Sequence, residues 1–261
     1  MGAILTQEWL SQPLVAAGLN DGDPINRALL FCTGFPSGRP INSGKGAYSN
    51  GAPTGAITPV PTKDGMAFRG GASKYYSCSG SVTVTSATFL VWGSKATQKD
   101  YAILIGSRGA DALGLLTPGF SGNSRVGYMW NGLYWNYDPG AGLNIPADKL
   151  VMMAVSVTPT AATIYLGSDG VITSSTNTAA HASQTVNGLV LGADTFDAAN
   201  RYWDGTMVQA RMWGRALPDL EIRALYASMW RGFDSSALDL IIPSAAAGGA
   251  TYNDSIAEAL T

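Results

Sequence analysis

Apolar and polar residues alternate along several short segments of the chain, with the period of two that is typical of β-strands. Residues 151–158 are a clear example, and residues 163–166 follow after a Pro159-Thr160 turn. We expect these two segments to pair as antiparallel strands. One face of the first would carry Val151, Met153, Val155 and Val157.

Other segments fit the same picture. Residues 88–94 are apolar on both faces, as expected for a central strand beneath a second layer, and residues 101–107 are expected to continue that strand. Further strands are expected at 27–32, 65–68 and 74–79, the last two around a Gly70-Gly71 turn, whereas the Gly-, Pro- and Ser-rich residues 33–64 are expected to form a long loop.

Residues 189–230 predict a strand, an aspartate-rich loop, a second strand and a helix. In the second strand Val208, Ala210 and Met212 alternate with their neighbours, so we expect it to be half buried. Pro218 suits the first helical position, and Gly232 is expected to end the helix. The predicted apolar helix face comprises Ile222, Leu225, Tyr226 and Met229.

This C-terminal stretch resembles the closing strand and helix of laminin-G-like domains in the concanavalin A-like lectin and glucanase superfamily. That pattern is a G-[ST]-hydrophobic strand, an aromatic residue, an R-A-L and an acidic helix. Here it reads Gly205-Thr206-Met207, Trp213, Arg215-Ala216-Leu217 and Glu221-Ile222-Arg223-Ala224-Leu225-Tyr226. The resemblance implies an all-β fold: a two-layer antiparallel β-sandwich of jelly-roll type with one short helix.

Length and composition agree with one such domain. The chain has 261 residues, of which 46% are hydrophobic and only 13% charged, and its 32 glycines and 13 prolines favour short strands joined by tight turns. We divide the chain into an N-terminal docking arm (1–23), the sandwich (24–233) and a C-terminal extension (234–261).

Charge and hydropathy exclude several partners. A net charge of -2 without a cluster of basic residues argues against nucleic acid, and no apolar run is long enough to insert into a membrane. No signal peptide is evident, so we expect the chain to be synthesised in the cytoplasm and to stay soluble unless something else exports it. Cys32 and Cys78 are expected to be buried thiols without a disulfide.

The N-terminal phrase Trp9-Leu10-Ser11-Gln12-Pro13, followed by the strand Asp23-Pro24-Ile25-Asn26-Arg27-Ala28-Leu29-Leu30-Phe31, resembles the opening of tailed-phage proteins that carry this kind of domain. The resemblance implies a component of the virion surface, such as a capsid decoration protein or a fibre. Its partners would be other virion proteins and copies of itself, for which a trimer is suitable. The expected assembly residues are Trp9, Leu10 and Leu14, because an arm this small cannot bury its own Trp.

Catalytic groups are scarce. Relatives that hydrolyse β-glucans carry an E-x-D-x-x-E strand, because retaining cleavage needs two carboxyl groups about 5 Å apart. The three glutamates of this chain, Glu8, Glu221 and Glu258, lie outside the expected sandwich strands. His181 is the one histidine, and we expect it on a solvated loop. We therefore expect no enzyme, with glycoside hydrolysis a distant third function.

Hard oxygen ligands gather in one loop, at Asp194, Asp197 and Asn200. These residue types bind calcium in some laminin-G-like domains, but they also form Asx turns, and we favour the turn over a calcium site. No other cofactor is expected.

An aromatic hairpin at residues 125–137 is the candidate glycan site. Its centre is Asn131-Gly132, a strong hairpin signal, and sugars stack their C–H faces on aromatic rings. The candidate residues are Tyr128, Trp130, Asn131, Tyr134, Trp135 and Tyr137. Alternatively, these rings are buried in the core or in a subunit interface.

Two functions from different classes therefore remain. The first is a non-enzymatic virion structural protein that assembles through its termini. The alternative is an adhesin that binds host-surface glycan, and the two are compatible.

Overall fold

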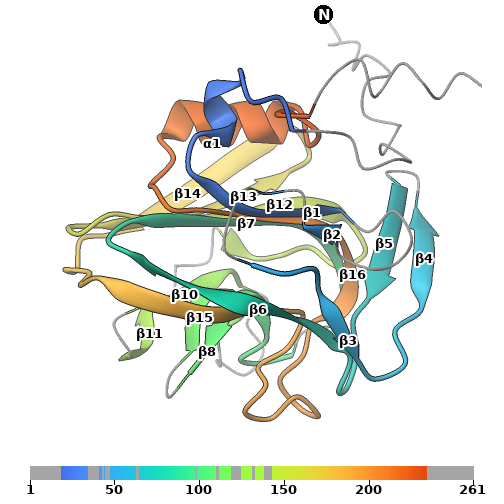
Figure 1. The fold of residues 1–261 in the computed structure, drawn as a ribbon. Helices are drawn as coiled ribbons and strands as arrows, with labels where there is room; N and C mark the ends of the chain where they lie inside the picture. The colour runs from blue at the N-terminus through green and yellow to red at the C-terminus, as the bar shows by residue number, and fades with distance from the viewer. Residues whose placement is uncertain are drawn as a thin grey trace, which may run out of the picture.

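The computed structural model describes residues 19–34, 41–42, 44, 48–62, 65–97, 99–109, 112–118, 125–130, 133–137 and 143–233. Within them the chain folds into two antiparallel sheets packed face to face (Figure 1). This confirms the predicted β-sandwich. Trp9, Leu10 and Leu14 of the arm, and the extension from residue 234, lie outside the described residues.

Within the described residues, one sheet has nine strands and the other has seven. The main path of the nine-stranded sheet is β14 (Val171–Asn177), β13 (Ala162–Ser168), β12 (Leu150–Val157), β7 (Ala87–Thr97), β16 (Asp204–Trp213), β1 (Leu29–Gly34) and β2 (Ile41–Asn42), with β5 (Gly65–Arg69) on β16 and β4 (Pro59–Thr62) on β5. The seven-stranded sheet runs β11 (Leu133–Tyr137), β10 (Gly127–Trp130), β9 (Ala112–Leu116), β8 (Ile103–Arg108), β15 (Gln184–Leu191), β6 (Tyr75–Val84) and β3 (Ala52–Thr54).

The main core lies between the two sheets, where apolar residues of alternating strand positions meet. The predicted pair β12 and β13 forms in register, with Val155 opposite Ile164. The predicted central strand β7 is buried from Ala87 to Gly93 and pairs with β12 on one side and β16 on the other. Both predictions are confirmed.

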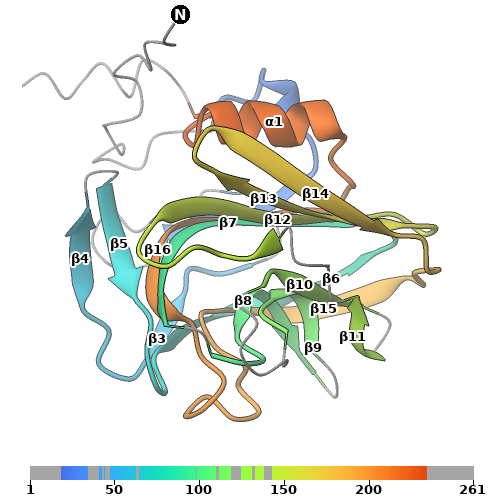
Figure 2. The ribbon, with the colours of Figure 1, turned by 180° about the vertical axis from the view of Figure 1, so that it is seen from behind.

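A second apolar layer covers the outer face of the nine-stranded sheet. Helix α1 (Asp219–Ala227) and the short 3-10 helix η2 (Pro24–Asn26) lie on this face (Figure 2). Ile222, Leu225 and Met229 are buried there, and the Tyr226 ring stacks on Trp92 with centroids 5.8 Å apart. The predicted apolar helix face is therefore confirmed for Ile222, Leu225 and Tyr226, whereas Met229 packs on the same layer from the turn after the helix.

Strand β16 is buried on both faces, so the prediction that it is half buried was wrong. A bulge between Met207 and Gln209 shifts the alternation, and Ala210 and Met212 face the core between the sheets. Val208 and Trp213 face the helix layer. Sequence periodicity identified two faces of this strand, but it did not show that α1 and the segment at Ile25 together cover the second face.

Three further features of the fold differ from the predictions. Residues 33–64 contain the short strands β2, β3 and β4, because their backbone pairs with neighbouring strands despite the loop-like composition. Strand β8 crosses to the seven-stranded sheet and does not continue β7. The helix ends at Ala227, before Gly232, and Pro218 is its N-cap residue without a side-chain hydrogen bond.

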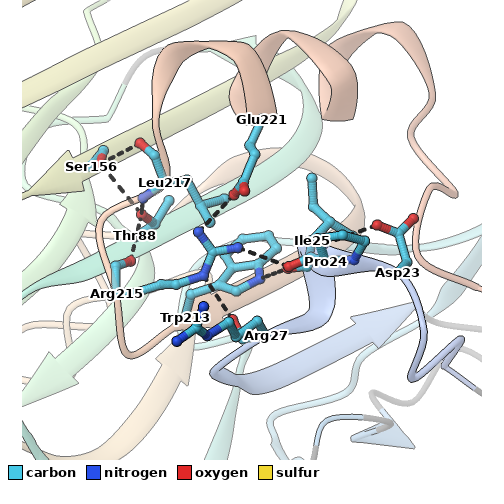
Figure 3. A network of polar contacts seen from close by, with 10 residues as sticks. All are labelled: Asp23, Pro24, Ile25, Arg27, Thr88, Ser156, Trp213, Arg215, Leu217 and Glu221. Atoms are coloured by element: carbon cyan, nitrogen blue, oxygen red, sulfur yellow. Dashed lines mark hydrogen bonds and ion pairs between the residues drawn. The ribbon is translucent and has the colours of Figure 1, made fainter.

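The motif residues after β16 join the N-terminal segment to α1 (Figure 3). Arg215 donates to the carbonyl oxygens of Arg27 and Pro24 and pairs with Glu221 at 2.7 Å. The indole Nε1 of Trp213 donates to the Ile25 carbonyl oxygen at 2.7 Å. Residues 23–27 are thus part of the folded domain.

Cys32 and Cys78 are buried free thiols, as predicted. Cys32 faces the helix layer and Cys78 faces the core between the sheets, so the two side chains belong to different apolar layers. Burial raises the pKa of both thiols, that of Cys78 to about 12.

Candidate functional site on the outer face of the seven-stranded sheet

The outer face of the seven-stranded sheet is polar where β6 and β15 pair. Tyr76 and Cys78 point into the core, so alternation turns Ser77 and Ser79 outward. The outward residues of this pair that are half or fully exposed are Ser77, Ser79, Ser81, Thr83, Thr185 and Asn187.

A bulge interrupts this polar pair of strands. The register shifts between Asn187 and Leu189, and Gly188 adopts a φ of 74°. Opposite, Gly80 has a φ of 144°. Left-handed backbone conformations are costly for residues with a Cβ, which explains a glycine at position 188. Two residues without side chains leave the sheet surface open here.

A groove of ≈ 470 Å³ lies over the bulge. Among its described lining residues Arg108 is the one charged side chain, and burial keeps the Cys78 thiol neutral. The lining residues are Ser49, Ala52, Ser77, Cys78, Ser79, Arg108, Asn187, Gly188, Leu189, Val190 and Thr195. The groove therefore combines hydroxyl and amide groups with a single guanidinium.

Arg108 stands at the end of β8, and its side chain is only 6% exposed. Its Nε lies 3.3 Å from Oδ1 of Asp194. The other oxygen of Asp194, Oδ2, lies 3.4 Å from Nη1 of Arg201. The Nη1 of Arg108, however, is buried and has no hydrogen-bond partner among the described residues. A buried donor without an acceptor carries a desolvation penalty of about 1–3 kcal/mol, which a bound acceptor would relieve.

The loop between β15 and β16 forms the rim of the groove and projects away from α1 (Figure 1). Thr195 lines the groove, and the next residue, Phe196, is 70% exposed. The Phe196 ring lies over two guanidinium groups, 5.0 Å from that of Arg108 and 5.3 Å from that of Arg201. This cation–π packing orients an exposed aromatic ring beside the groove.

The same loop contains the three candidate calcium ligands. Phe196 N donates to Oδ1 of Asp194, which closes an Asx turn there, and Asn200 Nδ2 donates to the carboxylate of Asp197. Two guanidinium groups neutralise the buried carboxylate of Asp194, and the alternative of a calcium site at Asp194, Asp197 and Asn200 stays a prediction. Among the described residues no cluster of three or more acidic, His or Cys side chains is placed to hold a metal ion.

The aromatic hairpin forms as predicted, with Trp130 opposite Leu133. The glycan-binding prediction was wrong for Tyr128 and Trp130, whose rings are fully buried in the core and present no face to a sugar. Asn131 and the side chains of Tyr134, Trp135 and Tyr137 lie outside the described part of the structure, so their role stays a prediction.

The two buried rings instead hold the loop between β14 and β15, which contains His181. Trp130 Nε1 donates to the Ala182 carbonyl oxygen at 2.7 Å. The Tyr128 hydroxyl accepts from Asn177 Nδ2 at 2.9 Å, which leaves its own hydrogen for His181 Nε2 at 2.8 Å. His181 is 3% exposed, so the prediction of a solvated histidine was wrong. Burial lowers the pKa of His181, whereas the backbone carbonyl group of Thr158, which favours the protonated ring, raises it to a smaller extent.

Sequence reasoning missed the groove, although a signal existed. Asn187-Gly188 is a turn dipeptide inside an otherwise regular strand, and an isolated glycine in a strand often marks a bulge. Nothing local indicated that Arg108, 79 positions earlier, would line the same surface.

Comparison with known proteins now places the fold. Residues 68–223, more than half of the chain, match the family model described as the concanavalin A-like lectin/glucanases superfamily. The chain belongs to this superfamily. The match spans β6 to α1 and includes both sides of the bulge and the loop that carries Phe196.

Solved structures with the same fold include domain 4 of AbnA, a GH43 extracellular arabinanase from Geobacillus stearothermophilus, in complex with arabinotriose. It is 19% identical, with a TM-score of 0.61, and the alignment covers 76% of this chain and 98% of that domain. A sialidase from Trypanosoma rangeli, in complex with the inhibitor DANA, is 13% identical with a TM-score of 0.52, and the alignment covers 79% of this chain but only 34% of the sialidase.

A structure of botulinum neurotoxin type C, whose cell entry depends on interaction with two ganglioside molecules, is 12% identical, with a TM-score of 0.51. The alignment covers 78% of this chain and 52% of that chain. At these identities the likeness concerns the fold alone. No curated protein sequence matches the chain. No helix among the described residues is long and apolar enough to cross a membrane.

Proposed function

We propose that this protein is a glycan-binding domain that works on the surface of a phage virion. The observation that carries the proposal is the polar groove over the β6–β15 bulge, bordered by the exposed Phe196 ring and containing the unpaired Nη1 of Arg108. Hydroxyl and amide groups along a groove match the hydroxyls of a sugar, and an aromatic ring at the rim offers a stacking surface for its C–H face.

Membership of a superfamily named for lectins and glucanases supports the proposal. The arabinanase domain of similar fold is solved in complex with arabinotriose, and cell entry of the neurotoxin depends on ganglioside interaction. These are properties of the other proteins, and they make glycan a reasonable ligand to test for this one.

The test is a glycan array probed with the full chain, followed by titration calorimetry on the glycans that bind. We expect Phe196→Ala to weaken binding by about tenfold, as expected for loss of one aromatic contact. Val171→Ser is the matched control, because Val171 is also exposed but lies on β14 of the other sheet. Binding that Phe196→Ala leaves unchanged would place the glycan elsewhere, with the Tyr134 to Tyr137 strand as the next candidate.

Assembly within a virion is a second function, favoured by a different observation. Leu19 and Phe233 form an antiparallel bridge, and Asn20 N donates to the Gly232 carbonyl oxygen at 2.8 Å. The arm and the extension therefore join the sandwich at neighbouring points near α1. The loop that carries Phe196 projects away from α1 (Figure 2). In this proposal the arm and the extension attach the domain to other virion proteins or to its own copies, and the groove faces the host.

Light scattering on the full chain and on a variant without residues 1–18 tests the assembly proposal. The deletion stops before Leu19 because residues 19–27 belong to the folded domain. We expect an oligomer that falls to a monomer without the arm, with an unchanged melting temperature of the sandwich. A monomer in both cases would contradict self-assembly through the arm.

We propose a binding role without catalysis. Glu221 lies in the first turn of α1, where it pairs with Arg215, far in sequence from any strand of the groove. Release of reducing sugar from a bound glycan by the purified protein would contradict this proposal.

A further inference from the structure

We propose that the groove selects an acidic glycan, one that carries a carboxylate or sulfate group, and that Arg108 is the residue that recognises the acid. This inference rests on the proposed glycan-binding function and names the ligand class of the same groove. The inference depends on the geometry of the Arg108 guanidinium group.

The Arg108 guanidinium is held in place before any ligand arrives. Its Nε is paired with Asp194 at 3.3 Å, and the Phe196 ring covers it at 5.0 Å. The side chain is 94% buried, since 6% of it is exposed. A guanidinium that is already ordered loses little conformational entropy when it binds an acceptor.

One end of this ordered group is left without an acceptor. Nη1 of Arg108 is buried and unpaired, although Arg108 lines the groove. Asp194 does not serve it: Oδ1 of Asp194 pairs with the Arg108 Nε and accepts from Phe196 N, and Oδ2 pairs with Arg201. The acceptor that completes the site must therefore come from outside the described protein.

The excess of positive charge around Arg108 favours an acidic acceptor over a neutral one. Two guanidinium groups share the single buried carboxylate of Asp194, and no described residue that lines the groove is acidic. Hydrogen bonds from guanidinium to carboxylate or sulfate oxygens are about twice as strong as neutral ones. A sugar hydroxyl would satisfy the hydrogen bond, whereas an acidic group would satisfy the hydrogen bond and the charge.

Titration calorimetry with paired ligands on the full chain tests the proposal. One pair is an oligogalacturonide and its methyl ester, which differ in the carboxylate charge. The other is a sulfated oligosaccharide and its desulfated form, so the two pairs distinguish carboxylate from sulfate as the source of the acid. We expect at least one acidic member to bind about tenfold or more tightly than its neutral partner, as expected for a charge-assisted hydrogen bond.

Arg108→Gln should remove the preference for the acidic member, and raising the salt concentration should weaken it. Arg69→Gln is the matched control, because Arg69 also pairs with an aspartate, Asp204, but lies outside the groove. Melting temperatures of both variants check the fold, and the wild-type comparison of acid and neutral partner stands even if Arg108→Gln unfolds.

Equal binding of acidic and neutral members, with both weakened by Phe196→Ala, would overturn the inference and leave the glycan-binding function intact. A preference for acid that persists in folded Arg108→Gln would also overturn it, because another residue would then recognise the acid. Failure of any glycan on the array to bind would overturn the inference together with the proposed function.

Discussion

The outer faces of the two sheets have opposite characters. The outer face of the nine-stranded sheet is apolar and covered by α1 and η2, with Trp213 fully buried and bonded to the segment at Ile25. The outer face of the seven-stranded sheet is polar along β6 and β15 and is opened by a bulge. The first face stabilises the fold by removing apolar surface from water, whereas the second leaves polar groups available to a ligand.

This difference separates stability from binding in the same domain. Substitutions under α1 should lower the free energy of unfolding and leave the affinity of the folded fraction unchanged. Substitutions at the groove rim should do the reverse. Four predictions test this separation.

The largest effect is expected for Trp213→Ala. The substitution removes a fully buried ring and leaves the Ile25 carbonyl oxygen without its indole donor, so the free energy of unfolding should fall by about 3–5 kcal/mol. Urea unfolding measures it. Leu220→Ala is the control on the same layer, because Leu220 is 79% exposed on α1 and should change stability by about 0.5 kcal/mol or less. A Trp213 effect as small as that of Leu220 would contradict the assignment of this face as a stabilising layer.

Gly188→Ala should affect both properties. Its φ of 74° costs a residue with a Cβ about 1–2 kcal/mol, and the new methyl group would enter the floor of the groove. Gly170→Ala is a matched control, because Gly170 has a φ of 80° with open space around it, on a turn of the other sheet. Both variants should lose similar stability in urea, but only Gly188→Ala should lose glycan affinity. Equal affinities would show that the bulge does not shape the binding site.

Lowering the pH should decrease the free energy of unfolding but leave the glycan affinity of the groove unchanged. The decrease should be smaller than the effects of Trp213→Ala and Gly188→Ala. Burial lowers the pKa of His181, so the unfolded chain binds a proton more readily than the folded chain. The free energy of unfolding should therefore decline as the pH falls below about 6.5, the usual value of a free histidine. Protonated His181 Nε2 would also lose its role as acceptor for the Tyr128 hydroxyl.

Urea unfolding between pH 7.5 and 5.5 measures the acid effect. His181 is the single histidine of the chain, so His181→Phe is a clean control and should have a flatter profile in this range. Glycan affinity of the folded protein should stay constant over the same range, because none of the described residues that line the groove is a histidine. An identical pH slope in His181→Phe would contradict the role of this histidine.

The smallest effect on stability is expected for Phe196→Ala. The ring is 70% exposed, so the free energy of unfolding should change by about 0.5 kcal/mol or less. Thermal melting beside the calorimetric titration gives both quantities for one variant. A large loss of stability would mean that the packing of Phe196 on Arg108 and Arg201 supports the loop, and the loss of glycan binding would then have a structural cause.

Much of the fold could be predicted from local pattern. Period-two alternation predicted β12, β13 and β16, the apolar run at 88–94 predicted a central strand, and Asn131-Gly132 predicted the hairpin of β10 and β11. Each of these signals depends on residues within a few positions of each other. They indicate which side chains share a face, and the resemblance of the closing motif at 205–226 to laminin-G-like domains indicated the sandwich fold.

The candidate site could not be predicted in the same way. The rings of Tyr128 and Trp130 have the pattern of a binding surface, but the loop at Asn177 to Ala182 covers them. Asp194 and Asp197 are residue types that bind calcium, but Arg108, which lies on β8, pairs with the Asp194 carboxylate and neutralises it. In both cases the deciding partner is distant in sequence, and a side chain's neighbours depend on which strands the fold brings together.

The amino-acid sequence alone determined β12, β13, the central strand β7 and the helix near residues 219–227, because these follow from the spacing of apolar residues along one segment. The sandwich class followed from the resemblance of the closing motif to laminin-G-like domains. Tertiary structure decided which face is covered, which of the polar residues are buried and where a groove opens. Burial and unpaired hydrogen-bond donors are properties of surfaces built from several segments, so Arg108, His181 and Phe196 acquired their roles only when β8, β10 and the loop after β15 came together.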